Sequence, residues 1–233
     1  IGRGANDMKS SIACFVSAVN KFLQIKPKFN GSISFLITGD EEGLAINGTK
    51  KVVDYLKKRK EKIDFCIVGE PTNPNKLGEM IKIGRRGSLT GKIEISGTQG
   101  HVAYPHLSNN PINTLISICK KLKDKKLDKG NKNFQPSNLE FTTINVDNKA
   151  HNVIPSRANA QFNIRYNNFH TARSLKKKIS LIIKTISKKN KCNFKVEYIA
   201  NGDSFLTKPE RTIYMAREII KKITKITPKF STT

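Results

Sequence analysis

Two kinds of apolar pattern alternate along the first 70 residues. Apolar residues recur at helical spacing over residues 8–23 and again over residues 49–60. Residues 32–38 (SISFLIT) and 63–69 (IDFCIVG) are short apolar runs, typical of strands that are buried on both faces. The resulting β-α-β succession predicts an α/β fold with a mainly parallel sheet and helices on its faces.

Beyond Gly87 the rhythm changes. The predicted strands are 89–96, 138–146, 157–165 and 193–199, and the predicted helices are 110–122 and 172–188. Their order, β-α-β-β-α-β, is that of a ferredoxin-like α+β unit. A further helical pattern begins at Pro209. We therefore expect an α/β domain (1–87) that is interrupted by an inserted α+β domain (88–201) and resumes over 202–233.

The composition is that of a globular protein with a large positive charge. Of 233 residues, 37% are hydrophobic, which is enough to bury a core. Lys and Arg number 43 against 18 Asp and Glu, a formal net charge of +25, so a nucleic-acid-binding protein is one alternative. Because the lysines are spread over the predicted helices and no nucleic-acid-binding motif accompanies them, we interpret them as solvated helix faces. No apolar run is long enough for a membrane span.

The cysteines and the first residues bear on the origin of the chain. The four cysteines are far apart and lie within apolar patterns, at Cys14, Cys66, Cys119 and Cys192. We expect buried free thiols, which fit a reducing compartment and hence the cytoplasm. The chain starts with neither an initiator methionine nor a signal peptide, so we expect a fragment that is cut at both ends.

Carboxylates follow both predicted strands of the first domain. Glu41 and Glu42 come after the first strand, Glu70 comes after the second, and Asp7 precedes the first helix. Ligands of open α/β sheets collect at the carboxyl ends of the strands. Neighbouring carboxylates repel one another unless a cation neutralises them, so the pattern predicts a metal site. Taken singly, Asp7 could cap a helix and the three glutamates could be ordinary turn residues.

The motifs around these carboxylates resemble the co-catalytic zinc aminoacylase and carboxypeptidase family. The shared acidic motifs are residues 2–9 (GRGANDMK), 38–42 (TGDEE) and 68–71 (VGEP). More specific stretches are residues 47–49 (NGT), 84–90 (GRRGSLT), 100–106 (GHVAYPH), 109–111 (NNP) and 152–155 (NVIP). The resemblance runs the whole length and implies a zinc-peptidase-like catalytic domain with an inserted dimerisation domain. It implies hydrolysis of an amide in a small-molecule substrate that carries several carboxylates. An acetylornithine-type deacylase or a dipeptidase of the same family is the alternative.

The resemblance also implies the roles of the acidic residues. Asp7 would bridge two zinc ions, for which cobalt could substitute, while Glu42 and Glu70 would each bind one ion. Glu41 would be the general base that activates the attacking water. The peptide bond between Asp7 and Met8 is commonly cis in this family.

The resemblance gives the inserted domain a catalytic part in a homodimer. His101 would reach the active site of the partner subunit and stabilise the oxyanion, with Tyr104 beside it. From the sequence alone, a structural hydrogen bond is the alternative for His101. Asn152 would contact the substrate, whereas His151 departs from the asparagine that is usual in the family.

Arginines are the candidate ligands for the carboxylates of the substrate. Arg85 and Arg86 lie in the specific stretch 84–90, and Arg165 ends an alternating strand. Arginine forms bidentate pairs with carboxylates, although surface charge is a serious alternative in so basic a chain. His106 and His170 are interpreted as ordinary loop and helix-start residues.

Part of the family's metal site has no counterpart in this sequence. The chain carries Asp7, Glu42 and Glu70 but neither the upstream His-x-Asp nor the downstream histidine that bind zinc in the family. We therefore expect the parent protein to be an enzyme and this chain by itself to be inactive.

Overall fold

The computed structural model describes residues 2–43 and 45–233 and divides the chain into two compact units. The N-terminal unit is Ile1–Thr72 and the C-terminal unit is Asn73–Thr233. We describe each unit by itself.

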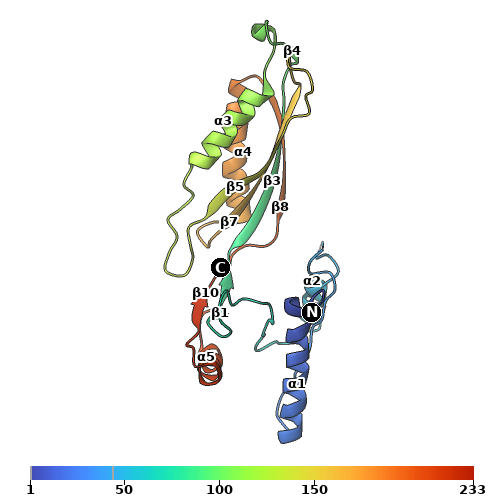
Figure 1. Cartoon of the computed structure of the whole chain (residues 1–233), viewed down its shortest axis with the longest axis vertical. Helices are drawn as coiled ribbons and strands as arrows, with labels where there is room; N and C mark the ends of the chain where they lie inside the picture. The colour runs from blue at the N-terminus through green and yellow to red at the C-terminus, as the bar shows by residue number, and fades with distance from the viewer. Residues whose placement is uncertain (1, 44) are drawn as a thin grey trace. The chain divides into compact units, whose positions relative to one another are not determined.

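The helices of the N-terminal unit follow the predicted pattern. A short π-helix, η1 (Ala5–Lys9), leads into α1 (Ser10–Ile25), and α2 (Thr49–Lys58) follows later in the chain (Figure 1). Asp7 lies inside η1 with non-helical backbone angles, so it does not cap α1. Both predicted helices are confirmed.

The two predicted strands of this unit are wrong for the described residues. Residues 32–38 and 63–69 have no assigned secondary structure and are not hydrogen-bonded into a ladder. Their apolar side chains are exposed, among them Phe35 at 45% and Ile67 at 65%. A strand needs a hydrogen-bonded neighbour, and one that is apolar on both faces also needs a cover on each face. The described chain supplies neither, and a mainly parallel sheet is not formed within it.

The C-terminal unit is built on a four-stranded antiparallel sheet. Its strands are β3 (Gly87–Ser96), β5 (Asn138–Asn145), β7 (Arg157–Tyr166) and β8 (Asn193–Ala200). They lie in the order β5-β7-β3-β8. Helices α3 (Pro111–Asp124) and α4 (Ala172–Lys189) cover one face (Figure 1). This order is the one that the predicted β-α-β-β-α-β succession gives in a ferredoxin-like unit.

The core lies between the sheet and the two helices. Alternate residues of β7 point into it, because successive side chains of a strand face opposite sides, and Phe162 and Ile164 are fully buried there. Leu89 and Ile95 of β3 meet Ile118 of α3 in the same cluster. The other face of the sheet carries the polar members of each alternation.

Shorter elements flank this sheet. They are β1 (Met80–Lys82), β2 (Gly84–Arg85), β4 (Gly100–His101), η2 (Pro105–Leu107), β6 (Val153–Ile154), β9 (Phe205–Leu206), α5 (Arg211–Thr224) and β10 (Lys229–Ser231). Strands β1 and β10 pair in parallel, which is the one parallel pairing in the part of the chain that the structure describes. Strands β2 and β9 pair antiparallel and bring the two ends of the predicted insertion together.

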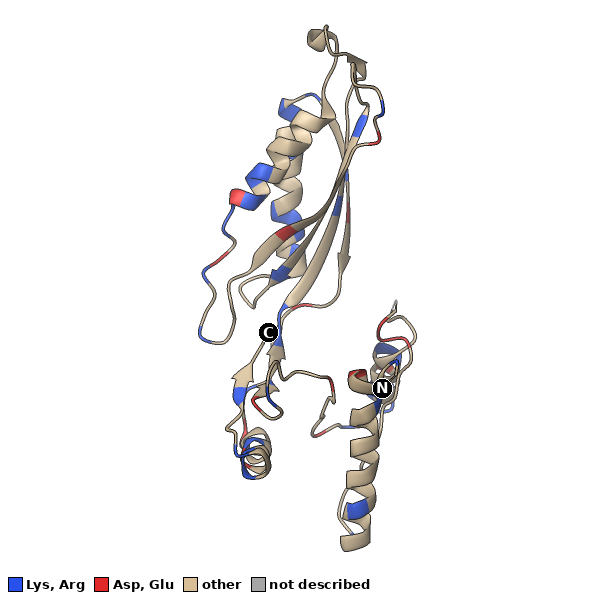
Figure 2. Ribbon diagram, in the orientation of Figure 1, with Lys and Arg blue, Asp and Glu red and all other residues tan. Residues whose placement is uncertain are grey.

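Lys and Arg occur on every α-helix, on strands and in loops rather than on one element (Figure 2). No helix among the described residues is long and apolar enough to cross a membrane. The expectation of buried thiols holds only for Cys192, since Cys14 and Cys66 are exposed and Cys119 is half-buried. Cys14 and Cys66 belong to the N-terminal unit, where the apolar runs have no cover.

Candidate active site

Three carboxylates of the N-terminal unit act on a fourth, that of Glu70. Asp7 lies in η1, Glu41 and Glu42 lie in the turn after residues 32–38, and Glu70 follows residues 63–69. Burial raises the pKa of Glu70, and a hydrogen bond with Asp7 and the charges of Asp7, Glu41 and Glu42 raise it further. A hydrogen bond between two carboxyl groups requires a shared proton, so negative charge is crowded at this point.

A close approach to α1 explains why Glu70 lies near Asp7. A side chain at Gly69 would meet the Phe15 ring at 2.7 Å and the Ser11 Cβ at 2.9 Å, so only glycine lets the end of residues 63–69 lie against the helix. Asp40 organises the neighbouring turn, since its Oδ2 accepts hydrogen bonds from the backbone amides of Ile46 (2.8 Å) and Asn47 (3.0 Å).

The chemistry of these donors suits a divalent cation. Carboxylate oxygens are hard ligands, and a cation would relieve the repulsion that raises the pKa of Glu70. No group of three or more His, Cys, Asp or Glu side chains in residues 2–43 and 45–233 is arranged to hold an ion by itself. The peptide bond between Asp7 and Met8 is cis, as the resemblance implies.

His101 lies at the tip of the C-terminal unit. Strand β4, which carries it, pairs with β6, so His101 stands opposite Val153. The exposed ring accepts a hydrogen bond at Nδ1 from the backbone amide of Ala103 (3.0 Å), and its centroid lies 5.9 Å from that of Tyr104. Because Nδ1 is an acceptor, the neutral ring carries its proton on Nε2, which makes Nε2 a hydrogen-bond donor.

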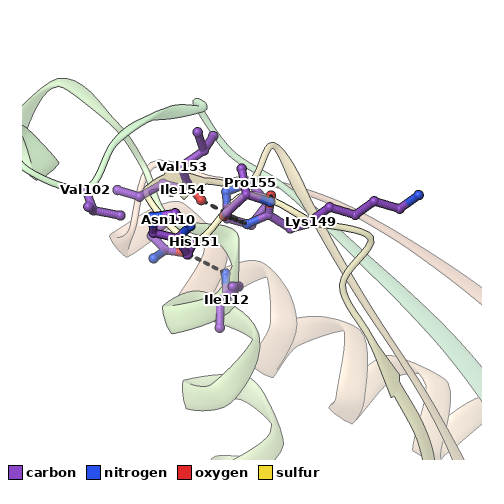
Figure 3. Close-up of a pocket in the computed structure, with 10 residues that line it drawn as sticks. Val102, Asn110, Ile112, Lys149, His151, Val153, Ile154 and Pro155 are labelled. Atoms are coloured by element: carbon purple, nitrogen blue, oxygen red, sulfur yellow. Dashed lines mark hydrogen bonds between the residues drawn. The ribbon is translucent and has the colours of Figure 1, made fainter.

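A pocket of about 500 Å³ lies beside this tip. It is formed by the loop before β6, by β6 itself and by the start of α3 (Figure 3). His151 and Lys149 line it, together with Asn110, whose side chain caps α3 by accepting a hydrogen bond from Ile112. Asn152 is exposed, and its backbone carbonyl accepts a hydrogen bond from the amide of Val102 (3.0 Å).

The candidate arginines gather at the other end of the same sheet. Arg85 and Arg86 precede β3, and Arg165 lies opposite Ser88 and Asn138 in the sheet register. Partial burial and the charge of Arg165 lower the pKa of Arg86. No ion pair joins these three arginines to a carboxylate within the described residues.

The predicted residues therefore form three groups. The carboxylates belong to the N-terminal unit. Within the C-terminal unit, the group around His101 and the arginine group lie beyond opposite ends of β3. A strand of ten residues spans about 30 Å, so the two groups do not meet within one subunit.

Sequence reasoning missed one polar cluster. His170, interpreted as an ordinary helix-start residue, is buried, and its Nε2 lies 3.2 Å from Asp128 Oδ2. Asp128 Oδ1 also accepts from Asn167 Nδ2 (2.6 Å) and from the amide of Gly130 (2.7 Å). Asp128 lies in a polar loop without periodicity, so the sequence carried no signal for this cluster.

Comparison with known proteins identifies the class of fold. Residues 83–191 match the family model described as "Peptidase dimerisation domain". The aminopeptidase PepT from Bacillus cereus has a similar structure, with a TM-score of 0.74 at 16% identity over 98% of this chain and 57% of that chain. The fold is therefore of the mixed α/β class and includes an α+β unit that matches a peptidase dimerisation domain, as predicted.

Individual relatives make the resemblance more specific. The chain is 66% identical, over 100% of its length, to the succinyl-diaminopimelate desuccinylase of Pelagibacter ubique (strain HTCC1062). It is 49% identical over 99% of its length to the enzyme of that name from Rickettsia bellii (strain RML369-C). The chain is thus a relative of the succinyl-diaminopimelate desuccinylases, and the resemblance inferred from its motifs is confirmed. It spans 61% and 59% of the length of these two relatives.

Proposed function

We propose that the full-length protein hydrolyses N-succinyl-L,L-diaminopimelate to succinate and L,L-diaminopimelate. The observation that carries this proposal is the 66% identity to a succinyl-diaminopimelate desuccinylase over the whole chain. Crowded carboxylates in one unit support it, as do arginines of the other unit that form no ion pair with a described residue, because the reaction needs metal ligands and the substrate carries several carboxylates.

We assign the metal ligands to the carboxylate cluster. Asp7, Glu42 and Glu70 would hold two divalent ions, zinc in the first place with cobalt as a substitute, together with residues outside this chain. Bound ions of this kind polarise a carbonyl group and lower the pKa of water. The raised pKa of Glu70 supports the assignment, because a site built for cations is unfavourable for its own negative charges.

We assign the remaining catalytic and substrate-binding roles to other residues of this chain. Glu41 would take the proton from the attacking water and return it to the leaving amine. His101 would donate its Nε2 proton as a hydrogen bond to the oxyanion of the tetrahedral intermediate. Arg85, Arg86 and Arg165 would bind substrate carboxylates, and Tyr104 and Asn152 would line the substrate site beside His101.

The domain and subunit arrangement belongs to the same proposal. Residues 1–87 and 202–233 would form parts of the catalytic domain, and residues 88–201 would form the inserted domain through which two subunits dimerise. The match of residues 83–191 to a peptidase dimerisation domain supports the homodimer. The four free cysteines suit the cytoplasm, where a biosynthetic enzyme of this kind would act.

A comparison of two substrates tests the reaction. The full-length protein with zinc is expected to hydrolyse N-succinyl-diaminopimelate far faster than N-acetylornithine, measured by amine release. A preference for N-acetylornithine would instead identify an acetylornithine-type deacylase.

A substitution of the base tests the assigned roles. Glu41→Gln is expected to lower kcat at least about 1000-fold, since general-base catalysis is removed, while metal content stays unchanged. The control is Glu61→Gln, which removes an exposed carboxylate paired with Arg59 and should leave kcat unchanged. If Glu41→Gln lost its metal together with its activity, Glu41 would be the metal ligand and Glu42 the general base.

A further inference from the structure

Arg86 is held by neutral partners. Its Nη1 donates to Asn138 Oδ1 at 3.0 Å and to the carbonyl oxygen of Pro136 at 3.4 Å. Neither acceptor carries a formal charge, so the guanidinium group is fixed in position without being neutralised. Arg165 lies close enough for its charge to act on Arg86, so two cations share one end of the sheet.

Of the two acceptors, Pro136 belongs to a segment that a buried carboxylate holds in place, and Asn138 directly follows this segment. Residues 128–137 precede β5, and the Asp128 carboxylate accepts from the amides of Gly130 (2.7 Å) and Ser137 (3.2 Å). Its side chain is only 8% exposed. One carboxylate therefore ties the start of this segment to the residue immediately before Asn138.

The residue that follows strand β7 also contacts the Asp128 carboxylate. Asn167, which follows β7 and is fully buried, donates to Asp128 Oδ1 (2.6 Å) and to the carbonyl oxygen of Gln135 (3.2 Å). Its backbone amide donates to Ser137 Oγ (3.0 Å). The segment is therefore fixed to the end of β7, two residues beyond Arg165. The same network of hydrogen bonds thus fixes the acceptors of Arg86 next to the strand that carries Arg165.

We propose that Asn138, fixed by the buried Asp128–Asn167 contact, is a positioning residue that holds Arg86 beside Arg165 as a preformed site for a substrate carboxylate. An arginine side chain loses much rotamer freedom when it binds an anion, and a neutral acceptor that fixes it beforehand removes that cost from binding. An acidic residue at position 138 would also fix Arg86 but would compete with the anion. The inference rests on the proposed function, since the carboxylate is taken to be that of the succinyl group.

Two substitutions at one position separate positioning from charge. In Asn138→Ala the guanidinium group loses its acceptor, and in Asn138→Asp it gains a competing carboxylate. Free succinate, measured by calorimetry with the full-length protein, is expected to bind about tenfold more weakly to each variant than to the wild type. Asn145→Ala, at the exposed far end of β5, is the matched control and should bind succinate as the wild type does.

Kinetics and a double variant distinguish positioning from a merely structural role. Asn138→Ala should raise KM for N-succinyl-diaminopimelate about tenfold with kcat within about twofold, because the carboxylate is bound equally in the ground and transition states. In an Arg86→Ala background, Asn138→Ala should change succinate affinity less than about twofold, since the two residues act through one contact. Asp128→Asn should reproduce the effect of Asn138→Ala.

Specific outcomes overturn the inference. Succinate affinities of Asn138→Ala and Asn138→Asp within twofold of the wild type would refute it, as would additive effects with Arg86→Ala. Wild-type protein that does not bind succinate would refute it too. Wild-type protein that binds succinate but does not hydrolyse the succinyl substrate would refute only the proposed function and leave the positioning of Arg86 standing.

Discussion

Like charges lie close together in both units of this chain. Glu70 is crowded by Asp7 and the neighbouring glutamates, and Arg86 is crowded by Arg165. Such repulsion costs stability, and a bound ligand of opposite charge would relieve it. From these residues we predict that a cation binds to the carboxylates and an anion binds to the arginines.

Asp128 differs from these residues, because its carboxylate accepts hydrogen bonds from several neighbouring groups. Burial alone would raise its pKa, but hydrogen bonds from Ser137, Gly130 and Asn167 hold the pKa below its usual value, and His170 faces the same carboxylate. The folded-state pKa is therefore below the unfolded value of about 3.9. Its contribution to the free energy of unfolding is complete above about pH 4 and is lost as the pH falls through the folded-state pKa.

Acid unfolding checks this behaviour. Asp128→Asn is expected to lower the free energy of unfolding by about 2 kcal/mol at neutral pH, since buried donors lose their acceptor, and to lose less stability on acidification. Urea unfolding between about pH 6 and pH 3 measures both effects. Asp124→Asn, which affects only an exposed pair with Lys120, is the control. Equal acid sensitivity of Asp128→Asn and the wild type would contradict the prediction.

Strand β3 is the element that organises the C-terminal unit. It pairs with β7 on one side and β8 on the other, and Leu89, Ile93 and Ile95 line its buried face. Gly91 interrupts this apolar series because the Phe162 ring of β7 lies over it. A glycine in a strand interior usually weakens the strand, and here the volume of the ring accounts for it.

A methyl group at Gly91 tests this packing. Gly91→Ala is expected to destabilise the unit by about 1–3 kcal/mol, because the new Cβ would overlap the fully buried Phe162 ring. Thermal unfolding, with hydrogen exchange of the β3 amides as the local readout, measures the change. The double variant Gly91→Ala/Phe162→Leu makes room for the methyl group and should recover part of the loss. No recovery would mean that the cost comes from the backbone instead.

At the scale of the whole molecule, the length of β3 separates two candidate groups. The arginine group and the group around His101 lie beyond opposite ends of a strand that spans about 30 Å. One substrate cannot contact both groups of a single subunit. A homodimer resolves the separation if His101 of one subunit acts on a substrate that is held by the partner.

Mixed dimers test this arrangement. Dimers of the full-length protein that combine a His101→Ala subunit with a Glu41→Ala subunit are expected to recover activity, because one of the two sites would combine an intact Glu41 with an intact His101. In random mixtures the expected recovery is about one quarter of wild-type kcat, because half of the dimers are mixed and each has one complete site. Homodimers of each variant are the controls. Mixtures as inactive as the homodimers would show that His101 acts within its own subunit.

Elements could be predicted from the sequence where the residues that bury them are nearby in the chain. The helix and strand patterns between Gly87 and Ala200 predicted the ferredoxin-like unit, because all four strands and both helices of that core are present. The same reasoning failed for residues 32–38 and 63–69. Their apolar patterns describe burial on both faces, and the described chain contains no ladder partner for them.

The sequence by itself determined the helices, the alternation of the sheet and the family motifs, because these depend on local spacing and residue type. Only the tertiary structure decided which side chains meet. It brought Asp128 to Asn167 across 39 positions and Arg86 to Asn138 across 52, and it set His101 apart from the arginines. Contacts between distant residues depend on how strands pair and helices pack. A single sequence carries no local signal for them, because the partners of a polar loop residue such as Asp128 are chosen by the fold.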